Sequence, residues 1–318
     1  MPLSSQMCES ICQELHSCCE LNHLIQVLAV LNSYQRQKIK EKYMELFGED
    51  PFLHFQNRND EPRLSIAGVG LAMLLQNPHQ RDAEAAREAL EQNEVVNNRA
   101  LLEIFTCRKS SHVALIQHAY LTKFRRHLDH DISSIEPPHP CQKILMALSA
   151  SHKAHSTDIS QHIAKCDARR LYQTGPTVNE ALVLEILSKR SIPQLKLTFS
   201  TYKHIYGHSY AKSLRKGNLG DFEEALEAVV KYIYSPTKYF SQMLYECLKG
   251  TTRDKRALIR IMVSRQAVDM EEIQVAFNKR HGADLKNAIC QNIPQGDYRE
   301  FLVTLATKAS NRSIPTSL

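Results

Sequence analysis

The chain has 318 residues, of which 43% are hydrophobic and 23% charged, the proportions of an ordinary soluble globular protein. Its length allows one large domain or several small ones. A net charge of +6 permits attraction to an anionic lipid surface without requiring it, and we expect no nucleic-acid partner. Few glycines (10) and prolines (12) favour helices over sheets.

The chain shows no signal for export, membrane insertion or catalysis. Its nine cysteines are odd in number and irregularly spaced, which argues against a disulfide framework and favours the reducing cytoplasm. Residues 1–10 lack the basic start and apolar core of a signal peptide. The longest apolar run, residues 66–75, is shorter than the roughly 20 residues that span a bilayer. We expect peripheral membrane association at most, and no enzyme, since no phosphate-binding loop or dinucleotide fingerprint is present.

Segments with helical periodicity follow one another along the chain, and no stretch shows the period-two alternation of a strand. Residues 35–50 predict a helix of about 14 residues that ends at Gly48. Similar amphipathic helices are expected in three later stretches: residues 112–128, 192–209 and 270–285. A further apolar helix is expected after each of these four: residues 64–75, 141–150, 222–234 and 298–306. The predicted fold class is therefore all-α.

Fixed offsets reveal an internal repeat. We measure offsets from four residues, each at the end of a short apolar segment, and call them the repeat origins. They lie 77, 82 and 75 residues apart: Leu31, Arg108, Arg190 and Arg265. Twelve residues after each origin stands an aromatic residue: Tyr43, Tyr120, Tyr202 and Phe277. Seventeen residues after each stands a position with glycine in three of four cases: Gly48, Arg125, Gly207 and Gly282. Glycine is typical just past a helix end. We predict four repeats of about five helices each, at residues 10–76, 83–152, 160–235 and 240–310.

The repeat resembles that of the annexin family over nearly the whole chain. Residues 258–265 (LIRIMVSR), with GADL at 282–285 and GDY at 296–298, resemble the fourth annexin repeat, and residues 34–50 resemble the first. SPTKYF at 235–240, together with a weak second and third repeat, is more similar to plant annexins than to animal ones. The resemblance implies a slightly curved disc of four five-helix repeats, which binds acidic phospholipid through Ca²⁺ on its convex face.

The calcium-binding loops that the family uses are degenerate in this chain. The family's best site combines a Gly-x-Gly-Thr loop with a later bidentate carboxylate, which suits an ion that takes six to eight oxygen ligands. In the fourth repeat the loop retains Gly250, but Thr252 replaces the second glycine and Arg253 the threonine. The carboxylate position falls on Asn292 or Ile293. A calcium site here would have to use Gly250, Thr252 and Asp254.

The other three repeats depart further from the pattern. Their loop and carboxylate positions fall on residues of the wrong kind: His16, Cys18, Cys19 and Arg58 in the first, residues 93–97 and Ser134 in the second, and Thr177, Val178 and Gly217 in the third. Lower-affinity sites built from Glu94, Glu180 or Asp254 with nearby carbonyls stay open. We expect calcium as a cofactor only with low affinity, if it binds at all.

Basic residues surround the degenerate fourth loop. Lys249, Arg253, Lys255, Arg256 and Arg260 against Asp254 leave a local charge of +4. Each basic residue near an anionic leaflet contributes roughly 1 kcal/mol. We hypothesise that Lys249, Arg253, Lys255 and Arg256 bind acidic lipid directly. The alternative is a solvated helix start with helical ion pairs.

A second candidate partner is F-actin. Ile259-Arg260-Ile261 resembles a short motif proposed for actin binding in plant annexins, although the two isoleucines occupy positions expected to face the core. The leading hypothesis is a cytoplasmic annexin that attaches peripherally to acidic phospholipid membranes. The alternative is a calcium-independent scaffold or adaptor in actin or vesicle trafficking.

Overall fold

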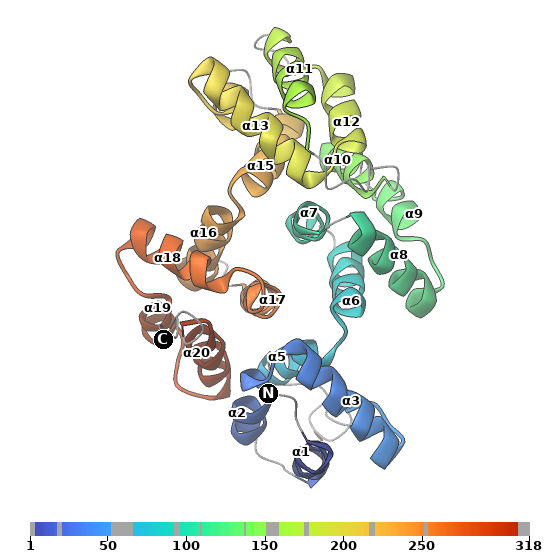
Figure 1. Cartoon of the computed structure of the whole chain (residues 1–318), viewed down its shortest axis with the longest axis vertical. Helices are drawn as coiled ribbons and strands as arrows, with labels where there is room; N and C mark the ends of the chain where they lie inside the picture. The colour runs from blue at the N-terminus through green and yellow to red at the C-terminus, as the bar shows by residue number, and fades with distance from the viewer. Residues whose placement is uncertain are drawn as a thin grey trace. The chain divides into compact units, whose positions relative to one another are not determined.

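The structure is a computed structural model that describes residues 4–17, 21–51, 66–91, 96–108, 110–136, 138–150, 159–174, 178–215, 220–250 and 254–310. Within these residues all regular structure is helical, in nineteen helices (Figure 1), which confirms the predicted all-α class. The chain divides into two compact units, which we call unit 1 (Met1–Pro78 with Thr237–Leu318) and unit 2 (His79–Pro236).

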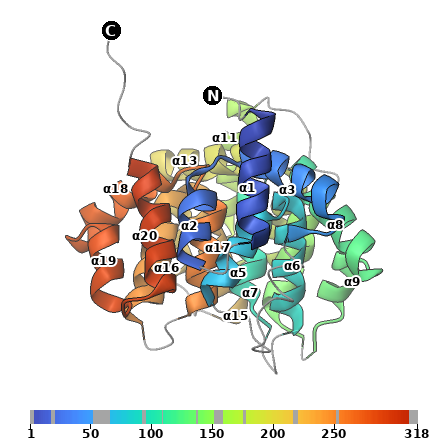
Figure 2. The same cartoon turned by 90° about the horizontal axis from the view of Figure 1, so that it is seen from below.

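Unit 1 joins the two ends of the chain. Its described helices are α1 (Ser5–Ser17), α2 (Leu21–Val30), α3 (Ser33–Phe47), α5 (Ile66–Leu75), α16 (Pro236–Lys249), α17 (Lys255–Arg265), α18 (Met270–His281), α19 (Leu285–Asn292) and α20 (Asp297–Ser310). At its centre α5 and α20 contact each other, and each of them also contacts α2 and α17; Figure 2 shows α2 and α20 side by side. Each contributes buried apolar side chains, among them Leu28, Leu71, Ile261 and Phe301. Burial of this kind stabilises by roughly 1.5–3 kcal/mol per side chain.

Unit 2 consists of the middle of the chain. Its described helices are α6 (Pro78–Glu91), α7 (Asn98–Cys107), α8 (Ser110–Phe124), α9 (Leu128–Ser133), α10 (Pro140–Ser149), α11 (Gln161–Gln173), α12 (Glu180–Lys189), α13 (Ile192–Tyr206), α14 (Tyr210–Leu214) and α15 (Asp221–Tyr234). Here α10 contacts α7, α12 and α15, and α15 also contacts α7. The core again consists of buried aliphatic side chains such as Ile104, Ile144 and Val229.

Short polar side chains define where many of these helices begin. Eight N-cap residues accept a hydrogen bond from the backbone N–H three positions later: Asn32, Asn97, Ser160, Asn179, Ser191, Ser209, Asp254 and Asp284. Each such bond satisfies one of the unpaired N–H groups of a first helical turn and contributes about 1 kcal/mol. At Asn32 the side chain of Gln35 returns the bond to the N-cap backbone, which completes a capping box.

The aromatic residues that the repeat places twelve positions after each origin are all buried. Tyr43, Tyr120 and Phe277 are 0% exposed and Tyr202 is 2% exposed. They lie in α3, α8, α18 and α13, and so anchor the corresponding helix in each repeat. The periodicity therefore identified core positions, because a large apolar ring that recurs at one helical register gains most from burial when it faces the core.

The positions seventeen residues after each origin have left-handed backbone. The φ angles are 72° at Gly48, 57° at Arg125, 73° at Gly207 and 67° at Gly282. Each N–H donates to the carbonyl four residues earlier, so all four residues end a helix. Among the described residues Arg125 is the one non-glycine with positive φ. An L side chain in this region costs roughly 1–2 kcal/mol.

Replacing Arg125 with glycine is therefore expected to stabilise the protein by about 0.5–1 kcal/mol, the strain relief less the greater freedom of glycine in the unfolded chain. Gly207→Ala is the matched change in the opposite direction and should destabilise by about 1 kcal/mol, although an added Cβ meets no atom within 4 Å. Urea unfolding of the two variants measures both effects. Equal signs would contradict this interpretation of the repeat.

The arginines at three of the repeat origins, Arg108, Arg190 and Arg265, bridge neighbouring carboxylates. Nε of Arg108 lies 2.6 Å from Oδ2 of Asp82, and Nε of Arg190 lies 2.7 Å from Oδ2 of Asp167. Arg265 instead uses Asp269 one turn later, with Nε 2.7 Å from Oδ1. These pairs fix helix ends within each unit and have a structural role.

Candidate functional site

The degenerate fourth loop lies in unit 1, between the end of α16 and the start of α17. Gly250 follows α16, and its N–H donates to the carbonyl of Glu246 over 2.7 Å. A Cβ at Gly250 would lie 2.3 Å from that same oxygen, so any other residue would force the backbone at this helix end to shift. The nearness of the Glu246 carbonyl is thus sufficient to explain a glycine at position 250, whether or not calcium binds there. Thr252 and Arg253 lie outside the described residues.

Asp254 is the N-cap of α17. Its Oδ1 accepts a hydrogen bond from the N–H of Ala257 over 2.9 Å. This is the ordinary role of an aspartate directly before a helix. Of the three residues predicted to form a calcium site, Gly250 and Asp254 thus each have a local structural explanation, and their part in calcium binding stays a prediction.

The position that would supply the bidentate carboxylate is occupied by an amide. Asn292 ends α19, and its Nδ2 donates to the carbonyl of Ala288 over 2.7 Å. Ile293 follows as the C-cap. An amide offers calcium one neutral oxygen, whereas the family's site needs both oxygens of a charged group. The described residues at this end of the fourth repeat do not fit that site.

Two described basic residues near the fourth loop lie at the positive, N-terminal end of the α17 dipole. Lys255 and Arg256 occupy the first turn of α17, which contains no acidic residue, and both are exposed. Cations at a helix N-terminus are unfavourable by about 0.3–1 kcal/mol each, because the macrodipole is positive there. Together with exposed Lys249 at the end of α16, they form a positively charged surface that we call the basic end. Lys255 and Arg256 are unfavourably placed for the stability of α17, whereas Lys249 is favourably placed at the C-terminus of α16, and all three are favourable for binding an anion.

Two tyrosine rings make cation–π contacts with the lysines of the basic end, and no motif in the sequence had indicated these contacts. Lys249 Nζ lies 5.4 Å from the ring centroid of Tyr245, and Lys255 Nζ lies 5.9 Å from that of Tyr298. The Tyr245 ring stacks on His281 at 4.0 Å. Burial lowers the pKa of His281, and the charges of Arg280 and Lys249 act in the same direction, so the ring stays neutral beside Lys249 at pH 7. Tyr298 was read in the sequence only as part of GDY.

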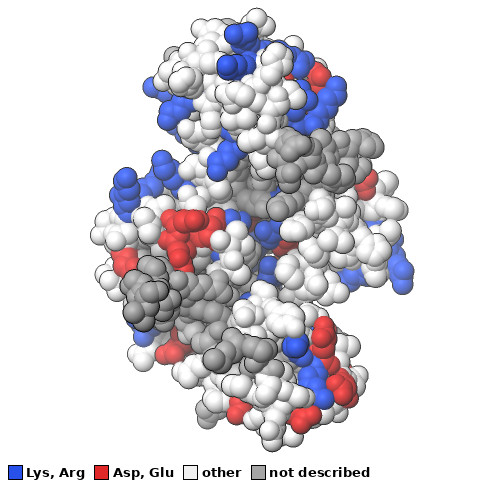
Figure 3. Space-filling model, in the orientation of Figure 1, with Lys and Arg blue, Asp and Glu red and all other residues white. Residues whose placement is uncertain are grey.

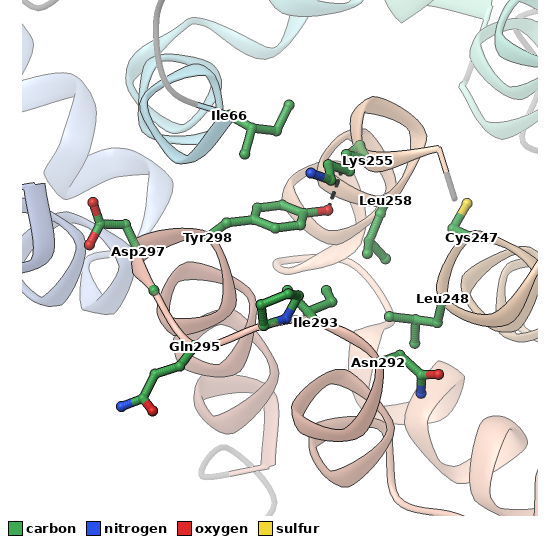
Figure 4. Close-up of a pocket in the computed structure, with 12 residues that line it drawn as sticks. Ile66, Cys247, Leu248, Lys255, Leu258, Asn292, Ile293, Gln295, Asp297 and Tyr298 are labelled. Carbon is green, nitrogen blue, oxygen red and sulfur yellow. Dashed lines mark hydrogen bonds between the residues drawn. The ribbon is translucent and has the colours of Figure 1, made fainter. Parts of the chain in front are cut away.

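A cavity of about 350 Å³ lies behind the basic end (Figure 4). Its walls come from α16, α17, the connection between α19 and α20, and the start of α5. The hydroxyl of Tyr298 donates to the carbonyl of Lys255 over 3.3 Å, which ties the start of α20 to the start of α17. Burial raises the pKa of Tyr298, so this hydroxyl stays protonated and able to donate.

The residues of the proposed actin motif lie within α17. Ile259 and Ile261 are both 0% exposed, and Arg260 is partly buried. Packing into unit 1 accounts for both isoleucines, which cannot reach a filament while the helix is in place. The actin interaction stays a prediction.

The remaining predicted calcium positions are scattered. Glu180 pairs with Lys143, with Oε2 2.9 Å from Nζ, and Ser134 ends α9 and donates to the carbonyl of His130. Several positions lie outside the described residues: Cys18, Cys19, Arg58, residues 93–95 (which include Glu94), Thr177 and Gly217. In the described part of the chain no three His, Cys, Asp or Glu side chains gather in a way that could hold a metal ion.

Basic residues are not gathered at one place on the face seen in Figure 3, where Lys and Arg form several separate groups with Asp and Glu among them. Within the described ranges, no helix combines the length and apolarity needed to cross a bilayer.

Comparison with known proteins gives one consistent result. The family model described as Annexin matches residues 167–229 and 239–305. Annexin A1 of Mus musculus is 33% identical over 289 residues, which cover 89% of this chain and 80% of that protein. Annexin A3 of Homo sapiens is 32% identical over 288 residues, which cover 89% and 86% respectively. The solved structure of annexin III matches with a TM-score of 0.84 at 29% identity, over 96% of this chain and 94% of that chain.

The expected similarity to plant annexins is not supported, because the relatives named above are mammalian. That expectation depended on one six-residue stretch and on the weakness of the second and third repeats. The family model nevertheless matches residues 167–229, within the predicted third repeat. Degenerate calcium loops change a few positions at helix ends and leave the apolar pattern of a repeat intact, so they do not indicate a lineage.

Proposed function

Because the chain belongs to the annexin family, we propose that it attaches peripherally to acidic phospholipid membranes through the basic end of its fourth repeat, residues 240–310. Calcium dependence is reduced or lost. The annexin family is non-enzymatic, and the proposal assigns the chain no catalytic role.

One observation carries this proposal: the position of the family's calcium-binding carboxylate is neutral, and the neighbouring helix start is positively charged. The carboxylate position holds Asn292, whose amide is bonded to its own helix, while Lys255 and Arg256 stand exposed in the first turn of α17. A calcium ion bridges two anionic partners, a protein carboxylate and a lipid phosphate. When the protein side carries positive charge instead, it can attract the phosphate without an ion.

The magnitude of the attraction is modest for each residue. Lys249, Lys255 and Arg256 together supply about 3 kcal/mol at the surface of an anionic leaflet, at roughly 1 kcal/mol each. Binding of this size is screened within a Debye length of about 10 Å at 0.1 M salt. The proposal therefore implies attachment that is reversible and sensitive to salt, as a peripheral protein requires.

Co-sedimentation with phosphatidylserine vesicles in excess chelator tests the proposal. We expect the protein to sediment at low salt, to be released as salt rises above about 0.2 M, and to ignore phosphatidylcholine vesicles. Adding calcium should change the bound fraction little. A requirement for calcium would contradict the proposal, as would absence of binding at low salt. Absence of binding under every condition would favour the scaffold or adaptor hypothesis.

A further inference from the structure

The cavity behind the basic end has mainly apolar walls. Leu248, Leu258, Ile293, Ile66 and Pro294 line it, from four separate segments of unit 1. Its volume of about 350 Å³ lies at the lower end of the range of small-molecule sites, which begins near 300 Å³. The cavity is therefore large enough for a small ligand, and it lies beside the surface that we propose binds the membrane.

Three of the polar side chains that line the cavity already have partners or point elsewhere. Asn292 donates to the carbonyl of Ala288, and the Tyr298 hydroxyl donates to the carbonyl of Lys255. Figure 4 shows the carboxylate of Asp297 directed away from the other side chains. A polar occupant such as a sugar would leave its own hydrogen-bonding groups unpaired against these walls, at a cost of about 1–3 kcal/mol for each group. An apolar occupant carries no such cost.

One cation stands at the edge of the cavity. Lys255 is the only Lys or Arg among the described lining residues, and its side chain is exposed. Its Nζ lies 5.9 Å from the ring centroid of Tyr298, which holds the ammonium beside the cavity. The other charged lining residue is Asp297, on the far side of Tyr298 in Figure 4. An occupant with an anionic group at one end would place that group at Lys255.

We propose that this cavity binds the apolar chain of an anionic amphiphile, with the head group at Lys255. At about 30 Å³ for each water-sized group, the volume holds roughly ten such groups, as many as the carbon atoms of a decanoyl chain. Two sources carry this chemistry, a free fatty acid and an acyl chain of an acidic phospholipid. The inference goes beyond the proposed function, because it concerns the chain of a lipid rather than its charge.

The test uses decanoate with a photoreactive diazirine at the end of its chain, followed by peptide mass spectrometry of the full-length protein. We expect labelling in the peptides that contain Leu248, Leu258 and Ile293. Unlabelled decanoate should reduce this labelling at least tenfold. Decyltrimethylammonium, which has the same chain length and the opposite head charge, should compete at least tenfold more weakly.

Two variants locate the two parts of the ligand. Ile293→Phe fills the cavity and should reduce labelling at least tenfold, while Lys255→Gln should reduce it about fivefold. Val275→Phe is the matched control, since Val275 is 68% exposed on α18 and does not line the cavity. Thermal unfolding shows whether each variant is folded. If Ile293→Phe does not fold, the peptide map and the competition in the wild-type protein still decide the question.

A second arm places the same diazirine on an acyl chain of phosphatidylserine in vesicles. Labelling of the cavity peptides in either arm supports the proposal and identifies the source. It is overturned if neither arm enriches these peptides, if a folded Ile293→Phe variant is labelled like the wild type, or if both head charges compete equally. Vesicle sedimentation in parallel separates the two claims: attachment without labelling overturns only this inference, and labelling by free decanoate without attachment overturns only the proposed function.

Discussion

Replacing Lys249, Lys255 and Arg256 together with glutamine is expected to weaken binding to phosphatidylserine vesicles about 150-fold at low salt. Each residue contributes roughly 1 kcal/mol near an anionic leaflet, and 1.4 kcal/mol corresponds to a factor of ten in affinity. The three residues lie at the facing ends of α16 and α17, so they can approach one patch of membrane together. Vesicle titration in chelator, followed by sedimentation, measures the loss.

The matched control removes the same charge from unit 2. Lys165, Arg169 and Lys196 are exposed on α11 and α13, and their replacement with glutamine lowers the net charge of +6 by the same three units. Its affinity should stay within about threefold of the wild type, because the attraction is local within a Debye length. Equal losses in both variants would mean that net charge, and not the basic end, binds the lipid.

A second variant, in which glutamine replaces only Lys255 and Arg256, should be slightly more stable than the wild type. Lys255 and Arg256 oppose the dipole of α17, so removing their charges relieves about 0.3–1 kcal/mol for each residue. Weaker binding combined with a higher unfolding temperature would show that these residues serve lipid binding and not the stability of the fold. A loss of stability would show that these residues serve the fold.

Replacing Arg190 with alanine is expected to destabilise the protein by about 3 kcal/mol. The side chain of Asp167 is 1% exposed and accepts two hydrogen bonds from Arg190, over 2.7 and 3.2 Å. Loss of the arginine leaves a buried carboxylate whose other cation, Arg170, lies 3.7 Å away and is 40% exposed. Removing one partner of a buried pair typically costs about 3–5 kcal/mol, and the partial exposure of Arg190 places the effect at the lower end.

Urea unfolding measures this effect against two controls. Lys143→Ala breaks an exposed pair with Glu180 in the same unit and should cost less than about 1 kcal/mol. The double variant Arg190→Met with Asp167→Leu should recover much of the loss, because it leaves no unpaired charge. If Arg190→Ala behaves like Lys143→Ala, the arginine at the repeat origin is not structural.

The candidate site could be predicted only in part from the sequence. The basic residues around the fourth loop and the amide at position 292 are visible in the printed chain, since both depend on residue type at a known offset. The roles of Asp254 and Gly250 were not. An aspartate before a helix and a glycine after one can serve a helix cap as well as a calcium loop. The bonds to Ala257 and Glu246 show the structural role, and a role in calcium binding stays a prediction.

The sequence by itself determined the helical class, the internal repeat, the buried aromatic residues and the helix-ending positions. These features follow from local chemistry, because periodicity, ring size and tolerance of positive φ are properties of short segments. The tertiary structure alone decided that Lys255 and Tyr298 meet, 43 residues apart, and that Ile66 joins them at one cavity. No local rule specifies which distant segments pack together, because that choice minimises the exposed apolar area of the whole unit.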